Sequence, residues 1–258
     1  MKKSGKILLL TIASTAVVSL LILVIFAVIS PQTKRLRLDS SGKGTYAVHK
    51  FDAPVKTIDI ESVGYGNLKI NVKCDGHNGY MIDGQYDKVF SHSITDGVLK
   101  ISIDGEFEEY LECEMTIFLA NPVDSIRSLG SGELYISKLF TPQLDISTEN
   151  GVTFDDCDIS RLDITYRSNS WEDMNLTVNH SKFENVNISS GSDMTLRNRG
   201  NIGLVSFSPR SDKDVILDID GLTSPDVKLI PTEKAKAGVL FSKPTLIPFK
   251  STPVTIEE

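Results

Sequence analysis

The sequence predicts an all-β protein, a β-helix (β-solenoid) preceded by one N-terminal transmembrane helix. Three observations predict this fold class. The chain opens with an uncharged apolar run, apolar and polar residues then alternate with a period of two, and from about residue 125 similar triplets recur at a loose period. Alternation is typical of strands that bury one face. Recurrence is typical of strands that stack in successive coils.

The apolar run extends from Ile7 to Ile29 and contains no charged residue. A bilayer core of about 30 Å requires about 20 apolar residues in a helix, so this run is long enough to span. The alternative is a cleaved secretory signal peptide, whose apolar region is normally about 7–15 residues long. We therefore expect an uncleaved signal anchor.

Lysine and arginine flank both ends of this run, so the positive-inside rule is nearly balanced. A short N-terminal tail before a single apolar segment is nevertheless the usual arrangement for export. We expect residues 1–30 to be a cytoplasmic tail and transmembrane signal anchor, and residues 31–45 to be a tether. The protein is then a single-pass protein of the cell membrane, with its C-terminal domain extracytoplasmic, in the periplasm or at the cell surface.

Short alternating strands follow residue 45. Residues 68–74, 99–103 and 111–119 each place apolar side chains on one parity and mostly polar ones on the other. Turn residues such as Asp96-Gly97 and Asp104-Gly105 separate them, because Gly, Asn and Asp tolerate the positive φ of tight turns. Each run predicts a strand with one buried face.

The loose period after residue 125 is formed by two interleaved series of similar triplets. In one series the spacings are 18 and 24 residues, and the triplets are Leu144-Asp145-Ile146, Leu162-Asp163-Ile164 and Val186-Asn187-Ile188. In the other the spacings are 18, 24 and 18 to 20 residues, and the triplets are Leu134-Tyr135-Ile136, Val152-Thr153-Phe154, Leu176-Thr177-Val178 and Met194-Thr195-Leu196. These series predict a β-helix domain over residues 46–222. The alternative is an antiparallel β-sandwich, which also has short alternating strands.

Residues 223–258 contain half of all the prolines. Proline cannot donate a hydrogen bond to a strand ladder and is confined to edges and ends. We expect this segment to be a C-terminal cap and extended tail.

Three segments resemble the "putative auto-transporter adhesin head GIN domain" family of bacteria. They are Asp96-Gly97 with the strand Val98–Ile101, the glycine-rich stretch Ile126–Ile136, and Leu144–Ser147. The resemblance covers roughly residues 50–222. It implies a single-stranded right-handed β-helix, exported or attached to a membrane, with no established enzymatic activity. After Gly151 the family's Gly-Ser-Gly turns give way to residues such as Arg167–Ser170, so the resemblance is weaker there.

The charge distribution argues against nucleic acid as a partner. The chain has 27 basic and 34 acidic residues, a net charge of −7. Residues 1–30 hold three lysines and no acidic residue, so the remainder carries 24 − 34 = −10. A body of this charge repels phosphate backbones.

The cysteines are Cys74, Cys113 and Cys157. Cys74 and Cys113 lie on the apolar parity of their strands, which favours buried thiols. The alternative is a disulfide between Cys74 and Cys113. Without a CxxC motif, a structural zinc site is not expected.

The histidines His49, His77, His92 and His180 lie far apart and lack metal-binding spacing, so they are interpreted as scattered surface residues. The acidic residues Asp155, Asp156 and Asp158 are interpreted as a solvated turn rather than a calcium site. We expect no cofactor, no metal and no catalytic residue, because the chain lacks the common nucleophile and phosphate-binding motifs.

Trp171 is the only tryptophan and lies in a turn-like segment. An exposed tryptophan is a candidate for ligand recognition, and the alternative is a ring folded over the edge of a coil. We expect a membrane-anchored, adhesin-like or cell-envelope binding module without catalysis, with an envelope glycan or surface protein as partner. The alternatives are a carbohydrate-active enzyme on a β-helix and an envelope-signalling component.

Overall fold

The structure is a computed structural model that describes residues 46–63, 67–104, 112–130, 132–167, 174–221, 225–241 and 254–256. The chain divides into two compact units, Met1–Ser40 and Ser41–Glu258, and all described residues belong to the second. The predicted span Ile7–Ile29 lies outside the described residues. Within the described ranges, no helix is long and apolar enough to cross a membrane.

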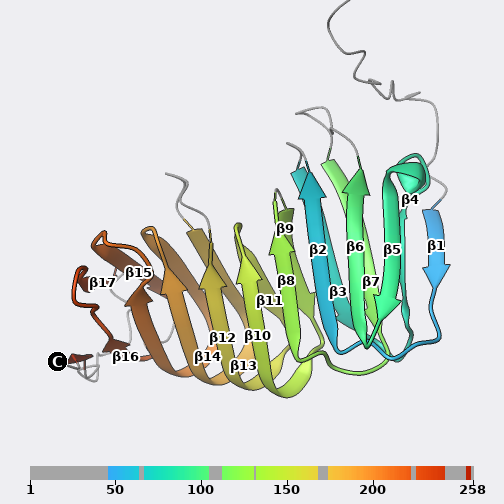
Figure 1. Cartoon of the computed structure of the whole chain (residues 1–258). Helices are drawn as coiled ribbons and strands as arrows, with labels where there is room; N and C mark the ends of the chain where they lie inside the picture. The colour runs from blue at the N-terminus through green and yellow to red at the C-terminus, as the bar shows by residue number, and fades with distance from the viewer. Residues whose placement is uncertain are drawn as a thin grey trace, which may run out of the picture. The chain divides into compact units, whose positions relative to one another are not determined.

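The described residues form an all-β body of eighteen strands and one 3-10 turn, which confirms the predicted class (Figure 1). In chain order the elements are β1 Tyr46–Lys50, β2 Thr57–Val63, β3 Asn67–Cys74, β4 Gly79–Asp83, η1 Asp87–Val89, β5 Phe90–Thr95, β6 Val98–Asp104, β7 Glu112–Leu119, β8 Ser125–Leu129, β9 Gly132–Ser137, β10 Phe140–Thr148, β11 Val152–Asp155, β12 Asp158–Tyr166, β13 Met174–Ser190, β14 Met194–Pro209, β15 Val215–Gly221, β16 Asp226–Leu229, β17 Ala237–Phe241 and β18 Val254–Ile256.

The strands pair in two long parallel series. The first ladder runs β6–β2–β8–β10–β12, continues through the second halves of β13 and β14, and ends at β16 and β18. The second ladder runs β7–β3–β9–β11, continues through the first halves of β13 and β14, and ends at β15 and β17. Because β13 and β14 each belong to both ladders, the chain passes directly from one to the other.

The register of these ladders matches the recurrences seen in the sequence. Leu144 lies opposite Leu162, and Leu162 lies opposite Val186. In the second ladder Val152 lies opposite both Leu134 and Leu176. At the next step Leu176 pairs with Leu196, a spacing of 196 − 176 = 20 residues, which is the upper end of the predicted 18 to 20. Parallel register in this region excludes the antiparallel β-sandwich for these residues.

Alternation decides which side chains enter the core. The apolar positions of the recurrent triplets are buried, as Leu144, Ile146, Leu162 and Ile164 show, while Asp145 between them is exposed. Full burial of a leucine or isoleucine contributes about 1.5–3 kcal/mol. Rows of stacked leucine, isoleucine and valine side chains therefore stabilise both ladders along their length.

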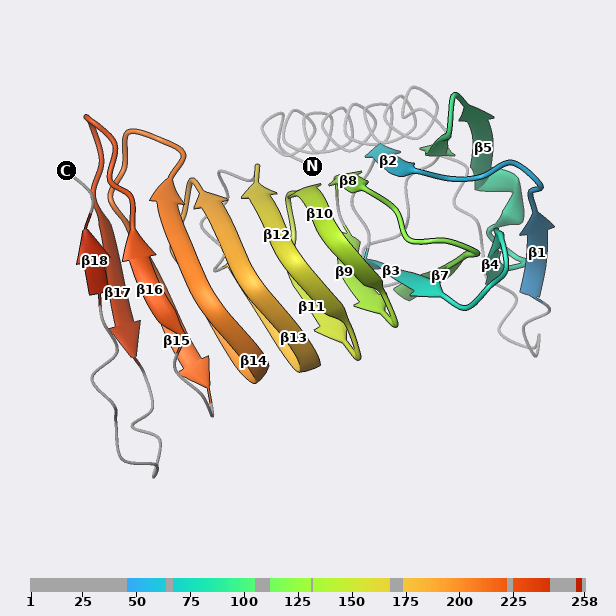
Figure 2. The same ribbon diagram turned by 90° about the horizontal axis from the view of Figure 1, so that it is seen from below.

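The two ends of the described body differ in their pairing. At the N-terminal end, antiparallel pairs β1–β4, β4–β7 and β5–β6 interrupt the parallel pattern. At the other end, β16, β17 and β18 extend the parallel ladders. Figure 2 shows β1, β4 and β5 gathered at one end of the row of strands and β17 and β18 at the other. Residues 223–258, expected as cap and tail, thus contribute strands to both ladders.

Candidate functional site

The structure describes some of the residues singled out in the sequence and not others. Trp171 lies outside the described residues, so its proposed role in recognition stays a prediction. Asp155, Asp156 and Asp158 lie at a corner where the chain passes from the second ladder to the first. Among the residues that the structure describes, no group of three or more His, Cys, Asp or Glu side chains could hold a metal ion.

A sharp corner recurs at this edge of the ladders. Lys138, Asp156 and His180 have φ angles of 56°, 56° and 46°, in the left-handed region. Backbone bonds tie one corner to the next, because the Lys138 N–H donates to the Asp155 carbonyl at 3.2 Å and the Asp156 N–H donates to the Asn179 carbonyl at 3.3 Å. The corner residues therefore stack in register, although non-glycine residues adopt this conformation rarely.

The inward-facing side chain at this corner becomes smaller from each turn of the chain to the next. Leu139, Cys157 and Ser181 are buried there in successive turns of the chain. The next corner is one residue shorter, because the register shifts after Asn179 and Gly200 occupies it. A Cβ at Gly200 would clash with the carbonyl oxygen of Ser181. Side-chain volume at this corner thus falls from leucine to glycine.

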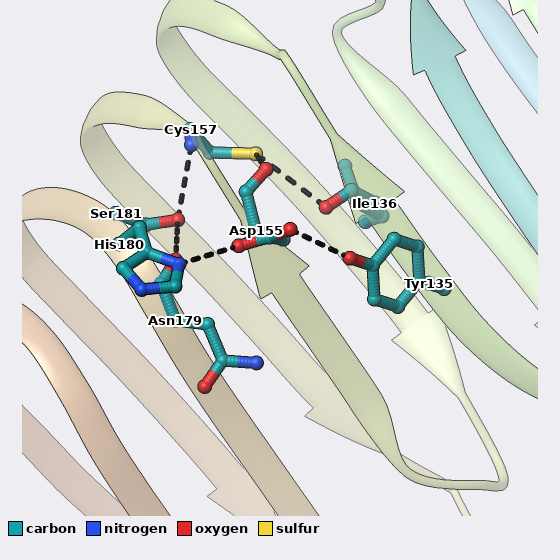
Figure 3. A network of polar contacts seen from close by, with 7 residues as sticks. All are labelled: Tyr135, Ile136, Asp155, Cys157, Asn179, His180 and Ser181. Atoms are coloured by element: carbon teal, nitrogen blue, oxygen red, sulfur yellow. Dashed lines mark hydrogen bonds and ion pairs between the residues drawn. The ribbon is translucent and has the colours of Figure 1, made fainter.

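Cys157 is held in this corner by backbone and hydroxyl groups. Its N–H donates to the Ser181 hydroxyl at 3.0 Å, and its thiol donates to the carbonyls of Asp155 at 3.4 Å and Ile136 at 3.6 Å (Figure 3). Burial raises the pKa of the Cys157 thiol. A buried thiol of raised pKa is an inert core residue rather than a nucleophile.

Asp155 is the centre of a polar network on the outward side of the same corner. The Tyr135 hydroxyl donates to Asp155 Oδ2 at 2.8 Å, and His180 Nδ1 lies 3.0 Å from Oδ1. Figure 3 shows Tyr135 and His180 on opposite sides of the carboxylate. These two bonds lower the pKa of Asp155, and burial together with the bond to Asp155 raises the pKa of Tyr135 to about 12. The carboxylate is ionised and the phenol protonated at neutral pH.

Beside this network the second ladder carries a polar groove of about 340 Å³. We call it the β9–β14 groove, and the lining residues used below are Glu133, Gly151, Thr153, Asn175, Thr177 and Arg197. Its floor is open because Gly151 has no side chain. A Cβ at that position would lie 3.4 Å from the Asn175 carbonyl oxygen, an ordinary contact distance.

One outward row of the ladder runs through this groove from Thr153 to Arg197 and continues to Tyr135 beside the groove. Tyr135 lies opposite Thr153, Thr153 opposite Thr177, and Thr177 opposite Arg197. Adjacent strands lie about 4.8 Å apart, so the row spans about 14 Å. In the described part of the chain, neither threonine hydroxyl has a hydrogen-bond partner, and Glu133 and Arg197 have no ion-pair partner. These groups are available to a ligand.

A second cluster joins two histidines at the N-terminal end. His49 stacks on Tyr80, with ring centroids 4.6 Å apart, and its Nε2 lies 2.5 Å from Asp87 Oδ1. Tyr80 Oη lies 3.2 Å from His92 Nδ1. Burial and the neighbouring His49 lower the pKa of His92. Sequence spacing gives no signal for this cluster, because the antiparallel pairing of β1 with β4 brings its members together.

The cysteines are free thiols, and the register excludes the Cys74–Cys113 disulfide. Cys113 lies opposite Leu68 and Cys74 lies opposite Leu119, so the two are at opposite ends of the β3–β7 pair. Six residues along a strand span about 20 Å, whereas disulfide-linked Cα atoms lie within about 7 Å.

No family model matches this sequence, and no curated protein matches it. Solved structures with a similar fold do exist. A "putative adhesin" from Bacteroides fragilis is 17% identical with a TM-score of 0.52, over 77% of this chain and 97% of that one. A "putative adhesin" from Parabacteroides distasonis is 13% identical with a TM-score of 0.49, over 84% and 98%. A "putative lipid binding protein" from the same species is 12% identical with a TM-score of 0.47, over 84% and 98%. The likeness to the Bacteroides fragilis structure is one of fold alone.

Proposed function

We propose that this chain is a non-catalytic, adhesin-like binding module of the cell envelope. Its binding surface is the outward face of the second ladder between β9 and β14. The observation that carries the proposal is the β9–β14 groove, whose carboxylate, guanidinium and hydroxyl groups lack partners in the described part of the chain. Polar groups held open on a regular scaffold suit the recognition of a glycan or a surface protein.

The platform in this proposal is a right-handed β-helix, in which each coil adds one strand to each ladder. The repeated register and the continuous passage of β13 and β14 between ladders support it. Its handedness follows the head GIN resemblance. Parallel strands joined at regular corners keep the outward rows at fixed spacing, so a ligand meets a preformed surface.

The same proposal places this body outside the cytoplasm, held by the apolar run Ile7–Ile29 through the tether 31–45. The length of that run and its lack of charge support an anchor. Residues 1–45 lie outside the described part of the chain.

The ionised state of Asp155 argues against a role as a general acid. A general acid needs a pKa near the working pH, whereas the bonds from His180 and Tyr135 lower the pKa of this carboxylate. Both partners fix its position on the ladder. Asp155 therefore orients neighbouring side chains in this proposal and transfers no proton.

The experiment is a binding screen with the full-length chain, purified in detergent, against glycans and envelope proteins. We expect a ligand whose binding is abolished by Gly151→Leu, which fills the groove floor. Gln143→Leu is the matched control, because it adds the same side chain to an exposed position of β10 in the other ladder. Binding to nothing in either panel, or equal effects of both variants, would refute the proposal. Turnover of a bound glycan would instead favour the carbohydrate-active enzyme.

A further inference from the structure

We propose that the β9–β14 groove binds an oligosaccharide that carries a carboxylate, and that Arg197 binds this carboxylate. The proposal rests on the proposed function of the same face and adds the chemical class of the ligand. Its basis is the arrangement of four outward side chains across the second ladder, together with Glu133 at the other end of the groove.

Arg197 is the first element of the argument. Two other arginines of the body differ in this respect, because Arg199 lies 3.6 Å from Asp220 and Arg161 lies 2.8 Å from Asp163. The guanidinium of Arg197 is exposed and has no ion-pair partner among the described residues. A guanidinium matches the planar geometry of a carboxylate and donates two parallel hydrogen bonds to it. Arg197 is thus a free carboxylate receptor at the edge of a groove.

The row beside Arg197 supplies the groups that sugars require. Thr177 and Thr153 follow it across the ladder and present hydroxyls without partners in the described part of the chain. A hydroxyl both donates and accepts hydrogen bonds, as sugar hydroxyls do. The row is about 14 Å long, which is long enough for more than one sugar ring. The ligand is therefore an oligomer rather than a single small acid.

Tyr135 closes the row at the end away from Arg197. Its hydroxyl is bound to Asp155, so the half-buried ring is fixed on the ladder instead of turning in solvent. A fixed aromatic ring costs little conformational entropy when a ligand packs against it. Glu133, exposed on β9, adds an acceptor for further hydroxyls.

Arg197 and the row of hydroxyls suit an acidic oligosaccharide better than a basic peptide. A basic peptide would place its cations against Arg197 and Arg199, and it would leave the row of hydroxyls without matching groups. The body's excess of acidic residues does not prevent anion binding here. Interactions beyond about 8–10 Å are screened at physiological salt, and Asp220, which lies opposite Arg197 on β15, is engaged with Arg199 at 3.6 Å.

The test uses the full-length chain in detergent and isothermal titration calorimetry. The probes are trigalacturonic acid, its methyl ester and sialyllactose, so that a chain of uronic acids and a terminal sialic acid are distinguished. We expect at least one acid to bind. If trigalacturonic acid binds, its methyl ester should bind roughly 10- to 100-fold more weakly, as expected for the loss of a charged hydrogen bond.

The variants separate the carboxylate contact from general charge. Arg197→Gln should weaken binding of the acid roughly 10- to 100-fold. Arg161→Gln, at an exposed position of β12 in the first ladder, removes the same charge away from the groove and should change the affinity far less. Gly151→Leu should abolish binding, and circular dichroism checks that each variant keeps its fold.

Three results would overturn the ligand class: equal binding of the methyl ester, equal effects of Arg197→Gln and Arg161→Gln, or no binding of either acid. If a neutral glycan or a protein binds the wild type and Gly151→Leu abolishes that binding, the proposed binding face is supported and the acidic ligand is refuted. If Gly151→Leu affects no ligand that binds, both proposals fall.

Discussion

His49 on β1 lies flat against Tyr80 on β4, with the ring planes inclined by only 16° and the centroids 4.6 Å apart. Around this pair, His92 approaches both rings and Asp87 approaches His49. Four elements, β1, β4, η1 and β5, thus meet in one cluster at the N-terminal end.

We predict that acidification loosens this end through His92. Its folded pKa lies below the ordinary 6.5, chiefly because of burial, with His49 as a second cause. The folded state therefore favours neutral His92, and this contribution is present above pH 6.5 and lost as the pH falls through the lowered pKa.

Thermal unfolding measured from pH 7.5 to pH 5 checks this prediction. The wild type should lose more stability over this range than His92→Gln, which cannot titrate. His77→Gln is the control, because His77 lies outside the His49–Tyr80 cluster and, among the described residues, is bonded only to the nearby Asp75. Parallel pH profiles for the wild type and His92→Gln would contradict the prediction.

Asp155→Asn should lower the pKa of Tyr135 from about 12 toward its ordinary value of 10. The substitution removes the carboxylate that holds the phenol proton, while burial, the largest cause of the shift, remains. The pKa of Tyr135 should therefore return only part of the way to its ordinary value. NMR titration of the Tyr135 ring signals measures it, and Asp163→Asn on the other ladder should leave the Tyr135 signals unchanged.

Phe154→Ala should destabilise the body by about 3–5 kcal/mol, because it opens a cavity in the core. Phe154 is fully buried and packs edge-to-face on Phe183, with centroids 5.1 Å apart. Urea unfolding provides the measurement. Thr153→Ala, one position earlier on the outward face, should cost far less, and similar losses for both would mean that the alternation does not define the core.

Gly200→Ala should destabilise by about 1–3 kcal/mol, as overpacking does. The new Cβ would meet the Ser181 carbonyl and lie 2.9 Å from Val178 Cγ1, so backbone must move. Gly238→Ala is the matched control, because its Cβ would find the nearest atom 3.8 Å away. A difference in midpoint temperature between the two variants reports the clash, and equal midpoints would show that the corner has room.

Much of the strand pairing could be predicted from the sequence. The alternation in Leu144-Asp145-Ile146 fixes which side is buried, and a one-residue slip would expose the whole apolar row. The spacing of similar triplets then gives the register, as the Leu144–Leu162 pair confirms. The predicted spacing of 18 to 20 residues includes the observed Leu176–Leu196 pair, whereas the one-residue shortening at Gly200 leaves no signal in the recurrent triplets.

The candidate site could not be predicted in the same way. Tyr135, Asp155 and His180 are separated by 20 and 25 residues, and each alone is an ordinary polar residue of a strand or turn. Only the stacking of corners brings them together. The groove depends on a missing side chain at Gly151, which carries no pattern of its own. Trp171, the residue that composition makes conspicuous, lies outside the described part of the chain.

The corner side chains Leu139, Cys157, Ser181 and Gly200 decrease in volume along the chain, so the repeats of strand and corner are not interchangeable. Repeats that share a strand pattern could otherwise be exchanged or duplicated without loss. A repeat with leucine at its corner would not fit beside the Ser181 carbonyl, where even a methyl group clashes. Corner volume therefore fixes the order of the repeats, and an inserted repeat should be tolerated only where neighbouring corner volumes match.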